Sequence, residues 1–418
     1  MIHVRKIVTV YALLMVVVSC YFFPFEFTFL PKGINTKMML AVCGVMFLCL
    51  HALRTSSVYI NKRLLWASLI VLVFCLVCFF AVDNNNTDDY SYALYVFSFG
   101  TWLGGAYATF SILRLYHNKV TFRVIMNYLI VVCVLQCVLA LIIDLSEPIK
   151  DIVDTYISQA TIAENDLLES IDRLYGIGAT LDVAGVRFSI VLLGLSVLVC
   201  RDHEIRDHRM LMVLYLFAFM VISIVGNIIS RTTLVGMSMA LFYFLIKTGS
   251  LIQIRKENIR FWWVVLLVGG IALVVAVYFY NNDEYFYSQL RYGFEGFFNW
   301  VEKGEWRTDS TDRLNSVMWI WPTDTRTWLG GTGIFKQFLG TDIGYCRFVL
   351  YAGLPALVVF SLFFVYNAFA LIPKMGRYRD FCLGLLVLGF IIWLKVATDL
   401  YIMYALLYCI DEEREVEE

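Results

Sequence analysis

Residues 345–371 read YCRFVLYAGLPALVVFSLFFVYNAFAL, an apolar run long enough to cross a bilayer as one helix. The charged residue in this run is Arg347, close to its start. A long polar segment comes before the run, from about residue 281 to residue 344, and in it arginines stand near glycines. Transporters usually keep their loops short, so this pattern predicts a membrane protein that handles a phosphorylated substrate at the membrane surface.

The rest of the chain is also apolar. Of its 418 residues 60% are hydrophobic, and the mean hydropathy is +0.74. A water-soluble core of this size would need far more polar surface, so we expect an all-α polytopic integral membrane protein with about twelve transmembrane helices. Residues 1–418 are expected to form a single membrane domain. The expected spans are 7–23, 38–53, 64–82, 91–113, 122–144, 183–200, 210–229, 232–246, 261–280, 345–371, 380–394 and 396–410.

Basic charge alternates between successive loops. One set of loops repeatedly carries lysine and arginine, whereas the opposite set includes residues 83–89, DNNNTDD, without a basic residue. Because basic loops favour the cytoplasmic side, we expect both termini in the cytoplasm. Two long periplasmic loops are then predicted, at 145–182 and 281–344. The short cytoplasmic loops contain no phosphate-binding glycine motif, so ATP is not the expected energy source.

Aromatic and charged residues interleave between Tyr285 and Glu302 in the second long loop. This pattern is typical of a helix that lies along the membrane interface. Two interpretations are open. The aromatic residues form a plain interfacial belt, or they form a platform, including Trp300, beside a sugar or lipid site.

A second short helix is predicted further along the same loop. Asp309 or Ser310 is a suitable N-cap, and the helix would run to Trp321 and stop at Pro322. Arg313 would then lie near the helix N-terminus, a position suited to anions. The alternative is that Arg313 is merely a solvated surface arginine.

Residues 330–333 form the cluster GGTG. Gly330, Gly331 and Gly333 can adopt backbone angles closed to other residues, and such a turn can expose N–H groups toward an oxyanion. An ordinary turn is the alternative.

Arginines are the informative residues of the expected outer side. A guanidinium pairs with phosphate oxygens through two N–H groups and does not lose its charge, so two or three arginines could bind a pyrophosphate firmly. Arg187 lies about one turn inside its span, where snorkelling to the interface is the alternative to facing a polar cavity. The five candidates are Arg173, Arg187, Arg231, Arg313 and Arg347.

Several short motifs follow one another on the expected outer side. They are RLYGIG at 173–178, SRTTLVG at 230–236, DRLNSVMW at 312–319, WLGGTG at 328–333, TDIGY at 341–345 and YAGLP at 351–355. Their order, spacing and placement resemble those of bacterial Wzy-type O-antigen polymerases and O-antigen ligases. The resemblance covers roughly residues 170–410.

This resemblance implies a glycosyltransferase of the GT-C type in the bacterial inner membrane. Its donor would be an undecaprenyl-pyrophosphate-linked glycan, polymerised as repeat units into O-antigen or a related surface polysaccharide at the periplasmic face. Besides that donor and membrane lipid, a chain-length regulator and a flippase would be partners, and nucleic acid would not.

The presence or absence of a histidine in one outer loop distinguishes the ligase pattern from the polymerase pattern. The ligase pattern has a histidine in the outer loop before the tenth span, whereas all five histidines here fall on or near the expected cytoplasmic side and the corresponding stretch offers Asp342. We therefore expect a polymerase. The alternatives are an O-antigen ligase that transfers glycan to lipid A-core, a lipid-glycan flippase or transporter, and an envelope scaffold.

The expected catalytic residues are Arg173, Arg231 and Arg313, which would neutralise the departing pyrophosphate, and Asp342, which would accept the proton of the acceptor hydroxyl. Asp312 is the second choice for the base. Arg347 would orient the carboxylate or touch phosphate, and sugar would lie against Trp300, Trp319 and Trp321. No outer cluster has metal-ligand spacing, so we expect a metal-independent reaction without a cofactor.

Overall fold

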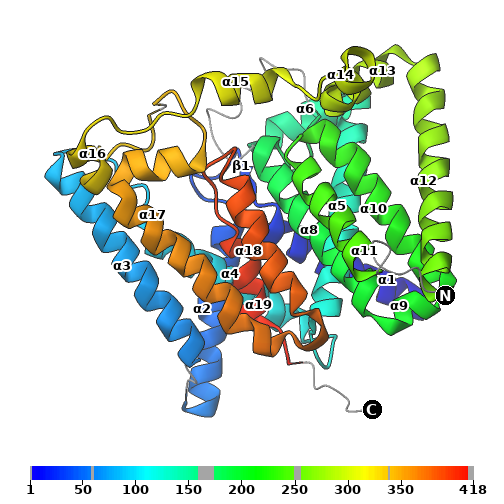
Figure 1. Ribbon diagram of the computed structural model, residues 1–418. Helices are drawn as coiled ribbons and strands as arrows, with labels where there is room; N and C mark the ends of the chain where they lie inside the picture. The colour runs from blue at the N-terminus through cyan, green and yellow to red at the C-terminus, as the bar shows by residue number, and fades with distance from the viewer. Residues whose placement is uncertain (1, 58–60, 159–173, 249–255, 338, 413–418) are drawn as a thin grey trace. The chain divides into compact units, whose positions relative to one another are not determined.

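The computed structural model describes residues 2–57, 61–158, 174–248, 256–337 and 339–412 (Figure 1). Helices make up 76% of the described residues. The two short strands of the described residues, β1 (Glu26–Phe27) and β2 (Ile157–Ser158), pair antiparallel. The chain divides into two compact units: unit 1 comprises Met1–Met39 and Tyr116–Trp306, and unit 2 comprises Leu40–Leu115 and Arg307–Glu418.

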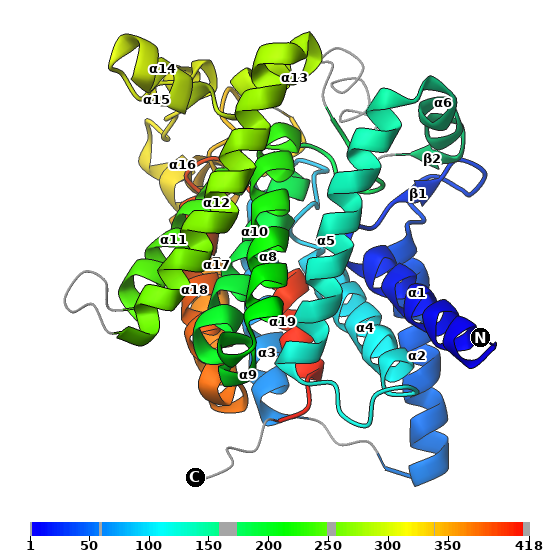
Figure 2. The same cartoon turned by 90° about the vertical axis from the view of Figure 1, so that its right-hand side faces the viewer.

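Unit 1 is built around α8 (Leu181–Arg201), which is buried along most of its length. Figure 2 shows α5 and α10 running beside it. Against α8 lies α11, where Gly236 is so close that an added Cβ would lie 2.2 Å from the Cα of Ser189. The Ser189 hydroxyl accepts a hydrogen bond from Gly236 N and donates one to the carbonyl of Thr232. The other helices of unit 1 are α1 (Ile2–Phe22), α5 (Phe122–Leu145), α6 (Glu147–Tyr156), α9 (His203–Asp207), α10 (Arg209–Ile229), α11 (Thr233–Lys247), α12 (Lys256–Asn282), α13 (Glu284–Gly293) and α14 (Glu295–Lys303).

Unit 2 packs α3 against a long, broken α17 through aromatic rings. Phe360 of α17 stacks on Phe74 of α3 with ring centroids 4.4 Å apart, and on Trp393 at 5.6 Å. Such pairs stabilise beyond the area that they bury. The helices that belong to unit 2 wholly or largely are α2 (Thr36–Thr55), α3 (Lys62–Asn84), α4 (Tyr95–Leu113), α15 (Asp309–Val317), α16 (Thr325–Gly330), α17 (Gly344–Leu371), η1 (Ile372–Lys374), η2 (Gly376–Tyr378), α18 (Asp380–Ile392) and α19 (Tyr401–Cys409).

A break divides α17 near its start. Ala352 and Gly353 leave the helical region, and Gly353 has φ +75°. Pro355 follows, and a proline removes one helical N–H donor. The carbonyls of Leu350 and Tyr351 are thereby released from the helical ladder, and they serve the site described below.

Eight helices among the described residues are long and apolar enough to cross a membrane. They are Thr36–Thr55, Lys62–Asn84, Tyr95–Leu113, Phe122–Leu145, Leu181–Arg201, Arg209–Ile229, Phe261–Asn282 and Gly344–Lys374. Four expected spans correspond to shorter helical segments: Lys6–Phe22, Thr233–Lys247, α18 and α19.

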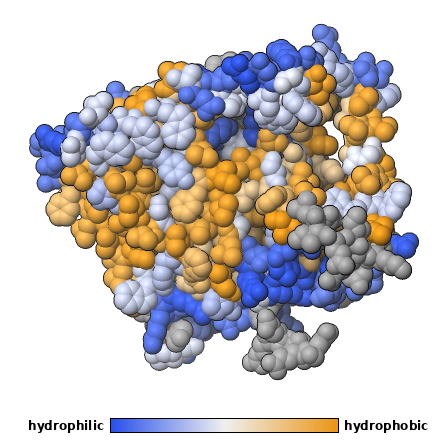
Figure 3. All heavy atoms as spheres, viewed as in Figure 1, coloured by the Kyte–Doolittle hydropathy of each residue, from blue (hydrophilic) through white to orange (hydrophobic). Residues whose placement is uncertain are grey.

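The surface fits a multi-pass membrane protein. Figure 3 shows hydrophobic side chains over the bodies of α3 and α17 and hydrophilic ones at their ends. In unit 1, α12 is exposed through Trp263, Leu266 and Val274, each more than 60% accessible. Apolar surface of this extent is stable in lipid rather than in water.

The second long loop differs from the sequence expectation in its helix boundaries. The aromatic stretch forms two short helices, α13 and α14, which meet at Phe294, instead of one. The next helix, α15, is capped by Thr308, whose hydroxyl accepts from Thr311 N at 3.1 Å, and it ends at Val317 rather than Trp321. A residue before proline avoids the helical region, so Trp321 could not extend it.

Candidate functional site

Arg231 lies in the short link between α10 and α11, after Ser230 has left the helical conformation. Its guanidinium forms an ion pair with Glu295 of α14 and lies 4.2 Å from the ring centroid of Tyr292 of α13. Both charged side chains are about one-fifth exposed. Arg231 was expected from the sequence but Glu295 was not, because no sequence spacing connects residues 64 positions apart.

The neighbours of Arg231 face the opposite way, toward α8. The hydroxyls of Thr232 and Ser230 donate to the carboxylate of Asp182 in the first turn of α8. Gly185 permits this close approach, because a Cβ there would lie 2.5 Å from Ser230 Oγ. The SRTT motif therefore anchors its hydroxyls on α8 while Arg231 is presented to α13 and α14. The sequence analysis also missed Asp182, although an acid in the first turn of a helix was a usable signal.

Arg187 of α8 is 8% exposed, and it binds protein groups instead of snorkelling. Its Nη1 donates to the carbonyl of Gly178 at 3.1 Å, and its guanidinium lies 5.4 Å from the ring centroid of Phe23. Gly178 has φ +69°, and a Cβ there would lie 2.4 Å from the Phe23 carbonyl oxygen. Arg187 thus fixes the segment that enters α8. Arg173, the first member of the expected clamp, lies outside the described residues.

An apolar cavity of about 590 Å³ lies in unit 1 between α10, α12 and α13. Ile228 and Leu290 line the end that adjoins Arg231, and Gly293 packs directly on Ile228. Arg231 follows Ile228 by three residues, and its ring partner Tyr292 follows Leu290 by two. The short link that carries Arg231 therefore begins directly after residues that line the cavity.

In unit 2 the GGTG turn binds the break in α17. Thr332 N donates to the Leu350 carbonyl at 2.7 Å and Gly333 N to the Tyr351 carbonyl at 2.9 Å, while Gly331 N donates to Thr327 within the end of α16. The expectation that this turn exposes N–H groups to an oxyanion is therefore wrong for these three groups. Carbonyls released by the helix break occupy two of them, and the cap of α16 occupies the third.

The glycines of the turn have different environments. Gly331 has φ +68°, and its Cβ would lie 2.2 Å from the Tyr351 carbonyl oxygen. Gly333 has φ +70°, and its Cβ would lie 2.6 Å from Thr87 Oγ1. Gly330 ends α16, and the nearest atom to its Cβ would be 4.0 Å away. Gly331 is required by its contact with the Tyr351 backbone, and Gly333 by its positive φ and its contact with the Thr87 side chain, whereas Gly330 is not required.

Asp89, between α3 and α4, binds the backbone of two residues shortly after the GGTG turn. Its Oδ2 accepts from Phe335 N at 2.6 Å and from Lys336 N at 2.5 Å, and its Oδ1 accepts from the Ser91 hydroxyl. Burial alone would raise the pKa of Asp89, but these hydrogen bonds outweigh it, so the pKa lies below its ordinary value. The sequence analysis used this stretch only for orientation and missed the anchor.

Arg347 and Asp342 lie on the same side of unit 2. Arg347 donates to the Phe335 carbonyl, and its guanidinium lies 4.1 Å from the Phe335 ring centroid. Asp342 is exposed, and its negative charge acts on Arg347 more strongly than that of Asp89. The charges of Asp342 and Arg347 therefore interact, but the two side chains form no ion pair with each other within the described part of the chain.

Arg313 in α15 is exposed and has no hydrogen-bond or ion-pair partner for its side chain among the described residues. The neighbouring Asp312 pairs with Arg307 at 3.1 Å, which favours a local role over that of a base. Trp321 stacks on Trp328 at 5.6 Å, and Trp319 lies 6.1 Å from Trp321. These indoles offer a partly exposed aromatic surface in unit 2.

The sequence-predicted site residues are divided between the units. Arg187, Arg231 and Trp300 belong to unit 1, whereas Arg313, Trp319, Gly330, Gly331, Gly333, Asp342 and Arg347 belong to unit 2. Within the described ranges no group of three or more histidine, cysteine, aspartate or glutamate side chains is arranged to hold a metal ion. Comparison with protein-family models, with curated proteins and with solved structures finds no match to this chain. Function therefore has to be inferred from the chemistry of these residues.

Proposed function

We propose that this chain is a multi-pass membrane glycosyltransferase that uses a lipid-linked glycan as donor. Its reaction would be the polymerisation of undecaprenyl-pyrophosphate-linked repeat units into a surface polysaccharide. The motifs at 230–236, 312–319, 328–333 and 341–345 support this proposal through their resemblance to O-antigen polymerases.

One observation carries the proposal furthest: the link with Arg231 begins directly after residues that line the apolar cavity of unit 1. An isoprenoid tail suits a cavity whose lining is almost wholly apolar. Its pyrophosphate would then lie near Arg231, and a guanidinium binds phosphate oxygens with two N–H groups. Glu295 and Tyr292 orient the guanidinium before the donor arrives.

Asp342 is the proposed base, with Arg347 beside it. The acceptor hydroxyl attacks the anomeric carbon of the donor sugar, so a new glycosidic bond forms as the bond from that carbon to the pyrophosphate oxygen breaks. The hydroxyl proton passes to the Asp342 carboxylate. The electron pair leaves on the pyrophosphate, whose negative charge a guanidinium would neutralise. Arg231 is the candidate for this role in unit 1 and Arg313 the candidate in unit 2, and Arg173 was the third candidate from the sequence.

The proposal includes the topology. In this proposal the chain has about twelve spans, the shorter apolar helices among them, with both termini in the cytoplasm of a bacterial inner membrane and the two long loops in the periplasm. The lipid-linked donor then meets the acceptor without nucleotide sugar or ATP. The long second loop distinguishes this arrangement from that of a typical transporter.

The experiment replaces Arg231 by Lys and by Ala in a strain that lacks the native gene, and measures the length distribution of the surface polysaccharide. Both variants, at normal membrane levels, should make single repeats instead of long chains. Loss of all glycan from the lipid A-core would instead indicate the ligase. Full-length polymer from both variants would exclude Arg231 from the site.

The matched control is Arg291→Lys. Arg291 lies on α13, pairs with Glu302 at 2.7 Å and lies against the rings of Tyr287 and Phe298, so it resembles Arg231 in its surroundings. Neither arginine lines the apolar cavity, but the Arg291 guanidinium contacts neither Glu295 nor Tyr292, the two residues that orient Arg231. The control should therefore keep the normal chain-length distribution.

A further inference from the structure

Two glycines bring α2 and α4 into contact within unit 2. A Cβ on Gly44 would lie 2.0 Å from the Gly104 carbonyl oxygen, and a Cβ on Gly104 would lie 3.2 Å from the Ala41 carbonyl oxygen. Only residues without side chains let two helix backbones approach so closely. Toward the C-terminal ends of both helices a cavity of about 500 Å³ opens between them.

The walls of this cavity change in character along its length. Near the glycine contact they are apolar, with Val45, Leu48 and Leu103. At the other end they include Asn61, Arg114 and Lys374. Gly100 also lines the cavity, and a Cβ built there meets no atom within 4 Å. The cavity therefore has an apolar interior and a basic mouth.

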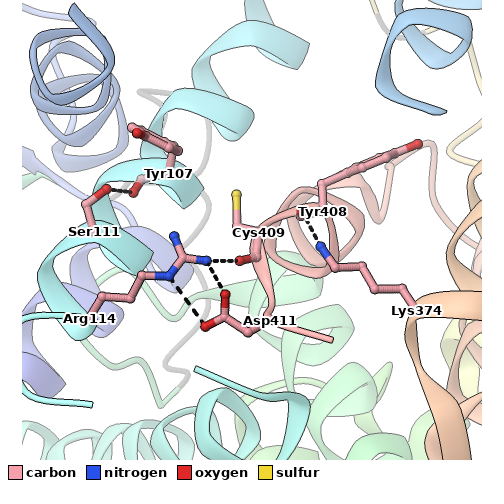
Figure 4. Close-up of polar contacts among 7 residues, drawn as sticks. All are labelled: Tyr107, Ser111, Arg114, Lys374, Tyr408, Cys409 and Asp411. Carbon is pink, nitrogen blue, oxygen red and sulfur yellow. Dashed lines mark hydrogen bonds and ion pairs between the residues drawn. The ribbon is translucent and has the colours of Figure 1, made fainter. Parts of the chain in front are cut away.

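Figure 4 shows how the two cations meet the C-terminal end of α19. Arg114 Nη2 donates to the Cys409 carbonyl and to Asp411 Oδ1, each at 2.8 Å, and Lys374 Nζ donates to the Tyr408 carbonyl at 2.7 Å. Cations at this position complement the negative end of a helix dipole. The two side chains are thus fixed in place without a ligand.

Arg114 and Lys374 each keep N–H donors that these hydrogen bonds do not use. Arg114 Nη1 has no hydrogen-bond partner among the described residues, and in Figure 4 it points away from Asp411. The ammonium of Lys374 has three donors, of which one is used within the described part of the chain. Two carboxylates face the two cations: Asp411 pairs with Arg114, and the negative charge of Glu412 acts on Lys374. The unused donors all belong to Arg114 and Lys374, so the mouth can still bind an anion.

We propose that this cavity binds one anionic phospholipid, with an acyl chain between α2 and α4 and the phosphate at Arg114 and Lys374. A zwitterionic lipid would bring its own cation to a mouth whose unused donors belong to two cations. A soluble phosphate would leave the apolar walls uncovered. Basic pockets between transmembrane helices recognise anionic headgroups by this combination of features. The site is independent of the proposed glycan chemistry, since none of its residues belongs to that site.

The experiment uses the purified full-length protein in detergent. Phosphatidylglycerol and phosphatidylcholine with the same acyl chains are titrated, and bound lipid is counted by native mass spectrometry alongside the apparent melting temperature. Phosphatidylglycerol should give one saturable adduct and raise the melting temperature, whereas phosphatidylcholine should bind at least about tenfold more weakly. Equal binding of the two lipids would overturn the proposal.

Two variants test the two ends of the cavity separately. Lys374→Gln should reduce the preference for phosphatidylglycerol. Gly100→Leu should fill the apolar part and remove the adduct, while leaving the Arg114–Asp411 pair intact. Arg377→Gln is the control, because Arg377 lies over the Tyr378 ring and does not line the cavity.

A third titration, with glycerol phosphate alone, distinguishes a lipid from a free phosphate. It should neither bind at comparable concentration nor raise the melting temperature. The lipid proposal fails if glycerol phosphate matches phosphatidylglycerol, or if the Gly100→Leu protein, shown to be folded, keeps the adduct.

Discussion

Single residues in unit 2 fix the loop that precedes α17 to the break in that helix. Thr332 and Gly333 bind the released carbonyls, and Asp89 holds the chain that follows. Without these contacts, Arg347 would lose the Phe335 carbonyl and ring that position it beside Asp342. The loop contacts are therefore the structural basis of the proposed base.

Gly331 is expected to be irreplaceable, whereas Gly330 is not. The backbone of Gly331, with φ +68° and ψ −170°, is nearly restricted to glycine, and its Cβ would meet the Tyr351 backbone. Gly331→Ala should therefore cost about 1–3 kcal/mol or more. Gly330→Ala should change stability by less than about 0.5 kcal/mol. Apparent melting temperatures in one detergent compare them, and an equal loss in both variants would contradict the geometry.

Asp89 is expected to make stability depend on pH. Its pKa is lower in the folded protein, so its contribution is fully present above the unfolded value of about 3.9 and is lost as pH falls through the lower folded value. Asp89→Ala should therefore destabilise the protein at pH 7, and the difference from the native protein should shrink in acid. Thermal unfolding between pH 7 and pH 3 measures it. A difference that stayed constant across this range would rule out the carboxylate as its source.

At the scale of elements, apolar length was enough to predict most of the helices. Each of the long runs at 64–82, 122–144 and 345–371 lies within a helix. The reason is that the backbone N–H and C=O groups of about twenty apolar residues in lipid must form hydrogen bonds within the segment. The boundary at Phe294 and the short α15 were not predicted correctly, since they depend on a cap from Thr308 and on local turns.

The partners of the site residues could not be read from the sequence for a different reason. Glu295, Asp182 and Asp89 act through contacts between segments that are far apart along the chain, and one sequence carries no signal for such pairs. Arg231 and Arg347 were identified because arginine near an apolar span is unusual by itself. The GGTG turn was recognised as a special backbone, but its N–H groups serve the break in α17, which periodicity did not reveal.

The helices α10 and α12 are expected to bind the lipid tail of the donor in the apolar cavity between them. Ala272→Phe places a ring in the apolar cavity and should raise the KM for a lipid-linked donor about tenfold, the effect of losing roughly 1.4 kcal/mol of binding. Val274→Phe is the control, because Val274 is on the same helix, is exposed and does not line the cavity. If both variants change KM equally, the cavity is not the binding site of the donor tail.

For the whole molecule, the sorting of basic residues predicts which segments face outward. In a protein without its native cysteines, an impermeant thiol reagent added to intact cells should label Asp88→Cys and Ser288→Cys. It should not label Asp207→Cys until the membrane is opened. These three positions are exposed in the structure, so access depends on the side of the membrane. Labelling of position 207 in intact cells would reverse the proposed topology.

Glycan polymerisation and glycan transport make opposite predictions for the molecule as a whole. A polymerase forms one glycosidic bond for every polyprenyl pyrophosphate that it releases. A flippase moves the lipid-linked unit across the bilayer and forms no bond. The apolar cavity next to Arg231 suits either lipid substrate, so the product distinguishes them.

The most direct measurement uses the purified protein in vesicles with a synthetic polyprenyl-pyrophosphate-linked repeat unit. New glycosidic bonds and free polyprenyl pyrophosphate are counted in the same samples. We expect equal numbers of the two with the native protein and with Arg291→Lys, and loss of both by a factor of about 100 or more with Arg231→Ala. Movement of the donor across the bilayer without any new bond would contradict the proposed function.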